Sequence, residues 1–188
     1  ALGAAKDRGI EVDPAVFKRA LDYWVGLHRG GGWSYHGSSS ASGSMTCAGI
    51  ASVIIARGGI ESGSSSIVGD QIRCCGQVDD KQDPVEAGLR WLGNSFSVRA
   101  NPGGSELTHF YYLYALERVG RLSGRRFIGG HDWYREGAEF LLQNQDGFQG
   151  FWAGKGQMGE SKRDVATSFA LLFLSKGKRQ VVIAQLKY

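Results

Sequence analysis

Three carboxylates stand close together in the run Asp79-Asp80-Lys81-Gln82-Asp83, a spacing that could hold a divalent cation. Magnesium prefers carboxylate oxygens, and a helix holds it best when the carboxylates share one face. Pro84 follows Asp83, however, and the residue before a proline is biased away from helical backbone. Asp83 is also a good N-cap for a helix with proline at its first position. We therefore expect Asp83 to cap a helix and Asp79 and Asp80 to lie in the preceding loop.

Two further sets of residues could do chemistry. Cys47 and His109 offer a thiolate and an imidazole, a sound pair for zinc, but no C-x-x-C spacing accompanies them. Asp132 and Glu136 could act as an acid/base pair, as two carboxylates do in glycoside hydrolysis. They also stand at the start of a predicted helix, where capping and the helix dipole favour acidic residues. We expect packed or solvent-bonded side chains for the first pair and helix capping for the second.

The segments that must position these residues share one apolar pattern. They begin at Thr46, His109 and Thr167, and the three segments can be aligned on these residues. The aligned positions are Gly49, Tyr112 and Ala170 at three residues on, Ile50, Leu113 and Leu171 at four, and Val53, Leu116 and Leu174 at seven. This spacing is one helix face repeated three times, and it predicts three equivalent helices.

Each of these helices is preceded by another with an aromatic anchor. The predicted ranges are Val16–His28 with Trp24, Pro84–Phe96 with Trp91, and Trp133–Asn144 with Phe140. Asp13-Pro14 and Asp83-Pro84 place an N-cap before a proline, and Glu86 completes a capping-box spacing. Glycine-rich turns join the paired helices, so the sequence predicts an all-α fold of helical hairpins.

We expect one domain over residues 1–188, with hairpins at about 14–58, 83–122 and 132–177. Residues 1–9 are expected to be the end of a preceding inner helix, because Lys6–Ile10 matches Ala56–Ile60. On this interpretation the chain is a piece of a longer repeat array. Other ranges are expected to lack helix: the loops Gly37–Ser44 and Gly58–Gly69, and a C-terminal extension at 178–188 in which Gln180–Leu186 could be extended.

The bulk properties are those of an ordinary protein, with a net charge of +4 and three cysteines. The basic cluster Arg118, Arg121, Arg125 and Arg126 is expected to be a solvated helix end, and no nucleic-acid motif surrounds it. The longest apolar runs are too short to cross a bilayer. We therefore expect no nucleic-acid partner, no membrane span and no cofactor.

The segment Gln145–Trp152 resembles the repeat of the prenyltransferase and squalene-oxidase family, in which Gln, Gly and Trp recur between paired helices. Gly31–Tyr35 resembles a second, less complete copy of this repeat. The segments Tyr111–Gly120 and Phe169–Gly177 resemble uncharacterised bacterial proteins that carry the repeat. The resemblance covers nearly the whole chain. It implies an α/α-toroid of the terpenoid-cyclase and protein-prenyltransferase type, with inner helices around a cavity. It also implies that Gln145 holds helix-terminal backbone groups.

The chain departs from that family in its chemistry. The Asp-x-Asp-Asp acid of squalene-type cyclases is absent, and Asp79–Asp83 instead resembles the magnesium-diphosphate motif of chain-elongating prenyl synthases. Protein prenyltransferases bind zinc through Asp, Cys and His on inner helices, but no Asp-x-Cys is present here. The resemblance thus supports the fold more than any reaction.

Six residues in turns or at inner-helix starts would face the mouth of such a toroid: Trp33, Tyr35, His36, His109, Tyr112 and Trp152. Their aromatic rings and polar tips could bind an apolar or carbohydrate-like ligand. The alternative is that Trp33 and Trp152 are structural repeat aromatics.

The leading functional expectation is a repeat domain that binds a ligand or partner in a toroid cavity without the usual cyclase acid or zinc site. The alternative is an isoprenoid-processing enzyme whose catalytic acid lies outside this segment. A glycan-active toroid is the third possibility. We also expect self-association through the apolar flanks of the end helices.

Overall fold

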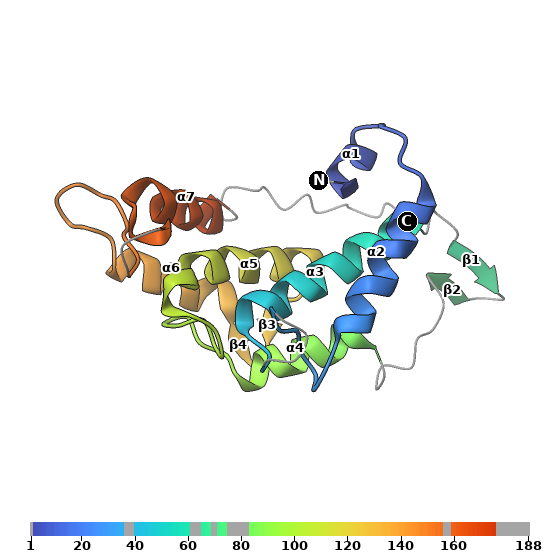
Figure 1. Ribbon diagram of the computed structural model, residues 1–188, viewed down its shortest axis with the longest axis horizontal. Helices are drawn as coiled ribbons and strands as arrows, with labels where there is room; N and C mark the ends of the chain where they lie inside the picture. Colours follow the sequence, from blue (N-terminus) through green and yellow to red (C-terminus); the bar gives the residue numbers. More distant parts are fainter. Residues whose placement is uncertain are drawn as a thin grey trace, which may run out of the picture.

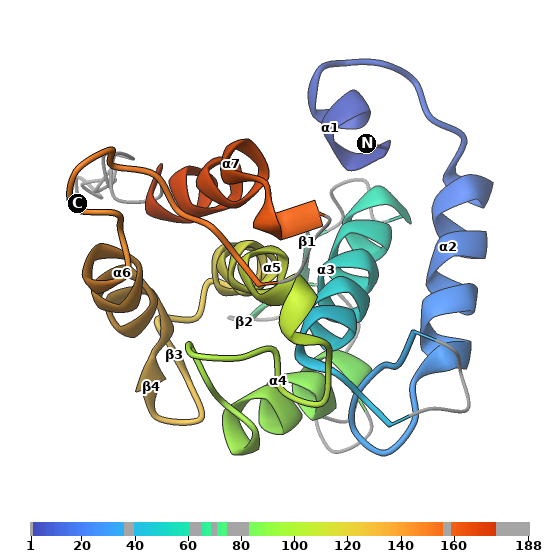
Figure 2. The same cartoon turned by 60° about the vertical axis from the view of Figure 1, so that its left-hand side comes forward.

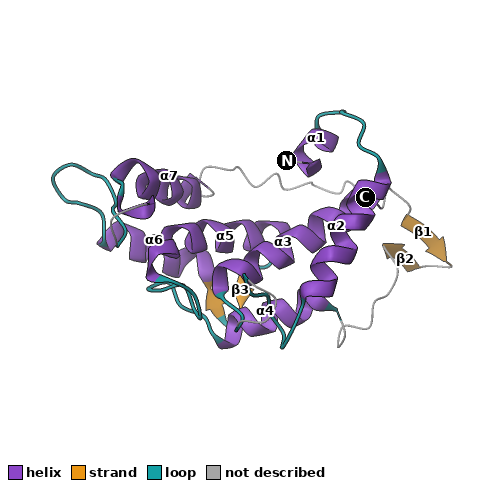
Figure 3. Cartoon of the chain, in the orientation of Figure 1, coloured by secondary structure: helices purple, strands orange, loops and turns teal. Residues whose placement is uncertain are grey.

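The computed structural model describes residues 2–35, 40–60, 65–68, 71–74, 83–155 and 159–175. The described part is mostly helical, which confirms the expected all-α class (Figures 1 and 3). Its α-helices are α1 Leu2–Asp7, α2 Pro14–Leu27, α3 Gly43–Ile60, α4 Pro84–Asn94, α5 His109–Leu122, α6 Trp133–Gln143 and α7 Arg163–Leu174. Two 3₁₀ turns, η1 Glu106–Thr108 and η2 Gly159–Ser161, precede α5 and α7.

The helices that carry the repeated apolar pattern pack side by side. α3 contacts α5, and α5 contacts α7, while α2 and α4 pack on α3, and α6 packs on α5 and α7. Figure 2 shows α2, α4 and α6 lying around the α3–α5 pair. α3, α5 and α7 therefore form one row, called the inner row, and α2, α4 and α6 pack against it as a second, outer row, while α1 lies beside α3.

Two short stretches of β structure interrupt the helices. β1 Ser65–Val68 pairs antiparallel with β2 Gln71–Cys74, and β3 Phe127–Ile128 pairs with β4 His131–Asp132. The expectation of a loop over Gly58–Gly69 is wrong on two counts, because α3 runs to Ile60 and β1 follows. The two strand sequences contain Ile and Val, residues that favour β structure. The expected extended segment Gln180–Leu186 lies outside the described residues.

Acidic residues cap three outer helices as expected. Asp13 accepts the Ala15 N–H at 2.8 Å, Asp83 accepts that of Val85 at 3.0 Å, and Asp132 accepts that of Arg135 at 3.2 Å. These bonds satisfy N–H groups that have no partner within their own helix.

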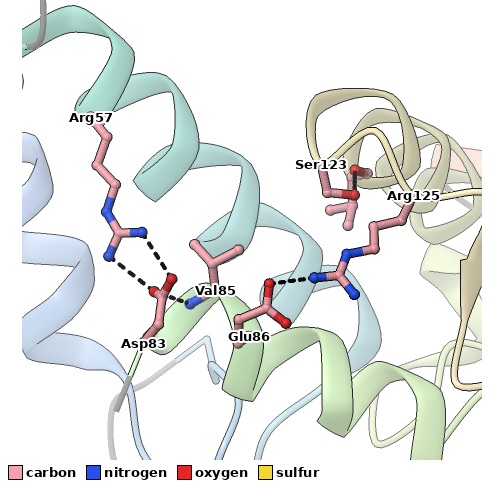
Figure 4. Close-up of polar contacts among 7 residues, drawn as sticks. Arg57, Asp83, Val85, Glu86, Ser123 and Arg125 are labelled. Carbon is pink, nitrogen blue, oxygen red and sulfur yellow. Dashed lines mark hydrogen bonds and ion pairs between the residues drawn. The ribbon is translucent and has the colours of Figure 1, made fainter. Parts of the chain in front are cut away.

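Asp83 also forms an ion pair with Arg57 of α3, whose guanidinium donates at 3.0 and 3.2 Å (Figure 4). Burial alone would raise the pKa of Asp83, but the hydrogen bonds from Arg57 and Val85 outweigh it and hold that pKa below its ordinary value. Glu86 does not act as the expected second half of a capping box, because its carboxylate pairs with Arg125 at 2.6 Å instead. The two ion pairs join α4 to α3 and to the segment that follows α5.

The inner helices α3 and α5 are capped by the hairpin that follows each of them. The Asn101 Oδ1 atom accepts the Ser44 N–H at the start of α3, at 2.9 Å. The Glu160 carboxylate accepts the N–H groups of Phe110 and Tyr111 at the start of α5, at 2.8 and 2.6 Å. Each capping residue lies in the turn before the next inner helix. The repeats are thus joined by hydrogen bonds at their helix starts as well as by apolar packing.

At the other end of α3, α1 packs beside its last turns. The Lys6 ammonium group donates to the carbonyl oxygens of Gly58 and Gly59, at 3.3 and 2.8 Å. A Cβ placed on Gly3 would lie 2.9 Å from the Ile55 side chain, so the α1 backbone packs closely on that side chain. Whether residues 1–9 are the end of another repeat helix stays a prediction.

Within the described residues one helix, α3, is long and apolar enough to span a membrane by length and composition. Half of it is buried inside the protein. Its place between α2, α4 and α5 explains its apolar composition, because the core helix of a bundle meets the same criterion.

Glu160 makes the stability of the fold depend on pH. Its side chain is 3% exposed, and burial raises its pKa above the ordinary value of 4.5 despite the backbone N–H groups that it accepts. As pH rises, the Glu160 carboxyl group therefore loses its proton at a lower pH in the unfolded chain than in the folded protein. The free energy of unfolding consequently decreases above about pH 4.5.

We predict that Glu160→Gln, which keeps a capping oxygen and removes the charge, becomes more stable relative to the parent as pH rises from 4 to about 7. Urea unfolding of both proteins at several pH values measures this difference. Glu139→Gln on the exposed face of α6 serves as the control. A parent protein that gains stability over Glu160→Gln with rising pH would contradict the assignment.

Candidate functional site

The two tryptophans expected at the cavity mouth lie in the core instead. Trp33 is 1% exposed and Trp152 is 3% exposed. Their indole N–H groups donate to carbonyls at the ends of the preceding outer helices, that of Trp24 at 2.7 Å and that of Leu141 at 2.8 Å. The placement of both residues on a ligand-binding surface was therefore wrong, and the alternative of structural repeat aromatics holds.

Both tryptophans are also fixed to the next inner helix through the backbone. The Trp33 N–H donates to the Thr46 hydroxyl at 3.2 Å, and the Trp152 N–H donates to the Thr167 hydroxyl at 3.0 Å. These two threonines are the residues on which the repeats align. Each tryptophan thus joins the end of one helix to the start of the next.

Gln145 does not have the role that the family resemblance implies. Its side chain donates to the Gly150 carbonyl at 2.7 Å, within the same turn. The Leu141 carbonyl at the end of α6 is bonded by Trp152 instead. A large ring with one N–H can reach a helix end and fill the core at once, which a glutamine side chain cannot do.

His109 takes the threonine position in the middle repeat. Its Nε2 atom donates to the Val98 carbonyl at 2.9 Å, and Nδ1 is then the unprotonated nitrogen of the neutral ring. Burial lowers the pKa of His109, the Val98 bond opposes this, and the charge of Lys155 lowers the pKa further. The ring is therefore neutral at physiological pH.

Tyr112 is fully buried at 0% exposure and packs against the start of α3. A Cβ at Gly43 would lie 2.6 Å from its ring, so the contact requires a glycine there. Burial raises the pKa of its hydroxyl, although a hydrogen bond with the Ser97 backbone opposes this. Tyr112 is thus a core residue and not a ligand contact, which corrects its assignment. His36 lies outside the described residues.

Two pockets are lined by described residues, and the larger of these two, called the main pocket below, lies at the starts of α3 and α5 with a volume of about 520 Å³. Its lining consists of hydroxyl and amide side chains, glycines, a methionine and two tyrosines: Tyr35, Ser40, Ser42, Ser44, Met45, Asn101, Gly103, Gly104, Ser105, Thr108 and Tyr111. None of the described residues in this lining carries a charge. The pocket is therefore suited to a neutral ligand with several hydrogen-bonding groups.

Asn101 organises the wall of this pocket. It is 4% exposed, accepts the Ser44 N–H, and donates from Nδ2 to the hydroxyls of Ser44 at 3.0 Å and Thr108 at 2.9 Å. A Cβ at Gly103 would lie 2.3 Å from the Ala41 carbonyl oxygen, and its φ of 63° favours glycine. The Asn101–Gly104 turn is thus held tightly against the segment before α3.

The tyrosines differ from the polar wall because they are accessible. Tyr35 is 77% exposed and Tyr111 is 38% exposed. The Tyr111 ring also packs edge-on against Phe169 of α7, with centroids 5.8 Å apart. The pocket therefore has a rigid polar wall and aromatic rings that ligand can contact.

A second pocket of about 350 Å³ lies on the other flank of η1 and contains His109. Apolar residues including Phe110 and Phe140 line it, and an ion pair between Glu106 and Lys155 at 2.9 Å lies in its wall. Of the expected site residues that the structure describes, Tyr35 and His109 line these pockets, and they line different ones.

Neither candidate metal site gains support from the geometry. Cys47 is fully buried, and burial raises the pKa of its thiol far above the ordinary value, so the thiol stays protonated. Among the described residues no three His, Cys, Asp or Glu side chains come together as a metal site would require. Asp83 is used as a cap, and Asp79 and Asp80 lie outside the described residues.

Asp132 and Glu136, the candidate acid/base pair, both form structural contacts. Asp132 caps α6 and pairs with Arg126 at 3.2 Å, as expected for a capping residue. Glu136 pairs with His131 at 3.2 Å, and the His131 ring stacks on Phe96 with centroids 4.2 Å apart.

No family model matches the chain, and no similar protein is found among the curated proteins or the solved structures compared with it. The interpretation of the pocket therefore depends on its own geometry.

Most of the pocket residues were missed from the sequence. The serines before α3 were expected only to form a mobile loop, and the Asn101-Pro102-Gly103-Gly104 turn only to join two helices. The sequence did contain a signal for this site. A serine-rich segment leads directly into the inner helix α3, and Asn101, a residue able to cap a helix, precedes the next inner helix, α5. Hydroxyls at such positions can serve the helix start and a ligand together.

We predict that Asn101→Ala destabilises the protein by about 1–3 kcal/mol, because the Ser44 N–H is left buried without its acceptor. Chemical unfolding monitored by circular dichroism measures the loss. Asn94→Ala, at the exposed end of α4, is the control and should change stability by less than about 0.5 kcal/mol. Equal effects of the two substitutions would show that Asn101 is not a cap.

Proposed function

We propose that this chain is a non-catalytic, ligand-binding repeat domain whose main pocket takes a neutral polyhydroxylated ligand, of the carbohydrate class. The single observation that carries the proposal is the lining of that pocket, which combines serine and threonine hydroxyls and an amide with two accessible tyrosines. Sugars present hydroxyls around their edge and a weakly apolar ring face, and this lining offers partners for both.

The aromatic rings favour a carbohydrate over a smaller polar solute. Tyr35 and Tyr111 can each present a ring face or a hydroxyl to a ligand at the rim. Met45 adds apolar surface beside them. A volume of about 520 Å³ is in the range of pockets that hold ligands of drug size.

The described part of the lining favours binding without turnover. Among the residues that the structure describes, the pocket is bordered by no carboxylate and no imidazole, which are the usual groups for acid/base catalysis of glycoside cleavage. An isoprenoid substrate would leave the hydroxyls of the wall without partners when it displaced water. A glycan-binding role therefore fits better than either enzymatic alternative.

The toroid architecture belongs to the same proposal. An inner row of α3, α5 and α7 with an outer row of α2, α4 and α6 is the arrangement that an arc of an α/α-toroid has. In a toroid the starts of the inner helices lie at one end of the ring, which is where the pocket lies along α3 and α5.

We predict that a glycan array identifies a bound oligosaccharide and that Tyr35→Ala and Tyr111→Ala each weaken its binding about tenfold, since a lost ring contact of about 1.4 kcal/mol gives that factor. Isothermal titration calorimetry measures the affinities. Tyr23→Ala removes a tyrosine that is 62% exposed on α2, away from the pocket, and should leave the affinity unchanged.

Thermal melting of each variant confirms that it is folded. The proposal fails if no glycan binds at millimolar concentration. It also fails if Tyr35→Ala and Tyr111→Ala bind as tightly as Tyr23→Ala, or if a farnesyl or squalene probe binds in place of glycans and is released by Tyr35→Ala.

A further inference from the structure

One face of α7 is open to solvent although it is partly apolar. Leu171 is 55% exposed and Leu172 is 47% exposed. Ser168 and Ser175 are exposed as well, and the four residues follow the i, i+3, i+4, i+7 spacing of a single helix face. We call these four residues the α7 face.

The equivalent positions of the earlier inner helices are covered. Leu171 aligns with Ile50 in α3 and with Leu113 in α5, which are 0% and 1% exposed. Ile50 is covered by α4, since a Cβ at Gly88 would lie 2.8 Å from its side chain. The hairpin that follows each inner helix provides this cover, because α4 and α5 pack on α3 and α6 and α7 pack on α5.

Among the described residues, none gives the start of α7 the capping acceptor that the other two inner helices receive. Asn101 and Glu160 cap α3 and α5 from the following hairpin. Lys162 is the N-cap residue of α7, and it provides no side-chain cap. The α7 edge of the described chain is therefore marked by two independent features: exposed apolar side chains and a helix start without a side-chain cap.

The opposite edge of the described chain has a matching gap. Ser52 of α3 is only half-buried, whereas its equivalents Ala115 in α5 and Phe173 in α7 are 9% and 0% exposed. α1 covers the last turns of α3 near Ile55, Gly58 and Gly59. The flank of α3 before those turns, which includes Ala48 and Ser52, has no inner helix beside it among the described residues. We call Ala48 and Ser52 the α3 flank.

The two edges are complementary in register. When Thr167 is aligned with Thr46, α7 spans the positions from Ser42 to Val53 of α3. When Lys6–Ile10 is aligned with Ala56–Ile60, α1 spans the positions from Ser52 to Arg57. A helix placed beside α3 in this register would therefore lie mainly before the span of α1, and the two spans overlap only at Ser52 and Val53. Leucines on one edge also face small residues on the other.

From this geometry we infer that a second copy of the chain binds head to tail, with the α7 face of one copy against the α3 flank of the next. The contact continues the packing of α3 on α5 and of α5 on α7, so it uses an interface already built twice within one chain. It is heterologous, because each copy contributes a different surface. The inference does not depend on the ligand proposed for the pocket.

Sedimentation velocity over a wide range of concentrations tests the contact. The parent chain should associate as concentration rises. Leu171→Asp on the α7 face and Ser52→Arg on the α3 flank should each stay monomeric at the highest concentration used, because each places a charge in the contact. Leu142→Asp removes an apolar side chain that is 63% exposed on α6, and it should associate like the parent.

A mixture of the two edge variants distinguishes a head-to-tail contact from a symmetric one. Leu171→Asp keeps an intact α3 flank, and Ser52→Arg keeps an intact α7 face, so an equimolar mixture should form dimers although neither variant does alone. Circular dichroism confirms folding, and Ala48→Arg replaces Ser52→Arg if the latter unfolds. A monomeric parent, edge variants that associate like Leu142→Asp, or a mixture that stays monomeric would each overturn the inference.

Discussion

The first-turn N–H groups of the inner helices are the constraint on which this structure depends. An α-helix cannot satisfy these groups by itself, and inside a bundle water is not there to replace the missing acceptors. In α3 and α5 the acceptors are Asn101 and Glu160, and both come from the following hairpin. Each hairpin is therefore completed by the next one, and the order of the repeats is fixed by polar bonds as well as by a generic apolar core. Trp33 and Trp152 do the corresponding work at the outer-helix ends, where each indole N–H bonds a terminal carbonyl.

The main pocket follows from this capping arrangement. To reach the start of α3, the Asn101–Gly104 turn must fold against the serines that lead into that helix, and the same contact brings Thr108 and Tyr111 beside them. The serine and threonine side chains near the starts of α3 and α5 therefore line one pocket, with Tyr35 at its rim. A binding surface of neutral polar groups thus arises where two repeats join, and the charged residues that could do chemistry are engaged elsewhere as caps and ion pairs, as Asp83 and Asp132 are.

The sequence was sufficient for the helices and their local caps, because periodicity and N-cap residues act over a few positions. The register of Thr46, His109 and Thr167 identified three helices that do pack side by side, and Asp13, Asp83 and Asp132 cap as expected. It was not sufficient for the site, because capping by Asn101 and Glu160 joins residues about 50 or more positions apart, beyond any local pattern. Trp33 and Trp152 were misplaced for a related reason: a turn tryptophan can face a cavity or the core, and only the packing of the neighbouring helices decides.

Amide hydrogen exchange on the monomeric chain tests the central claim, that the following hairpin caps each inner helix. The amides of Ser44, Phe110 and Tyr111 should exchange slowly, because Asn101 and Glu160 bond them within the core. The first amides of α7, at Arg163 and Asp164, should exchange rapidly, because Lys162 gives that helix no side-chain cap. Equally rapid exchange at the starts of α3, α5 and α7 would contradict the account.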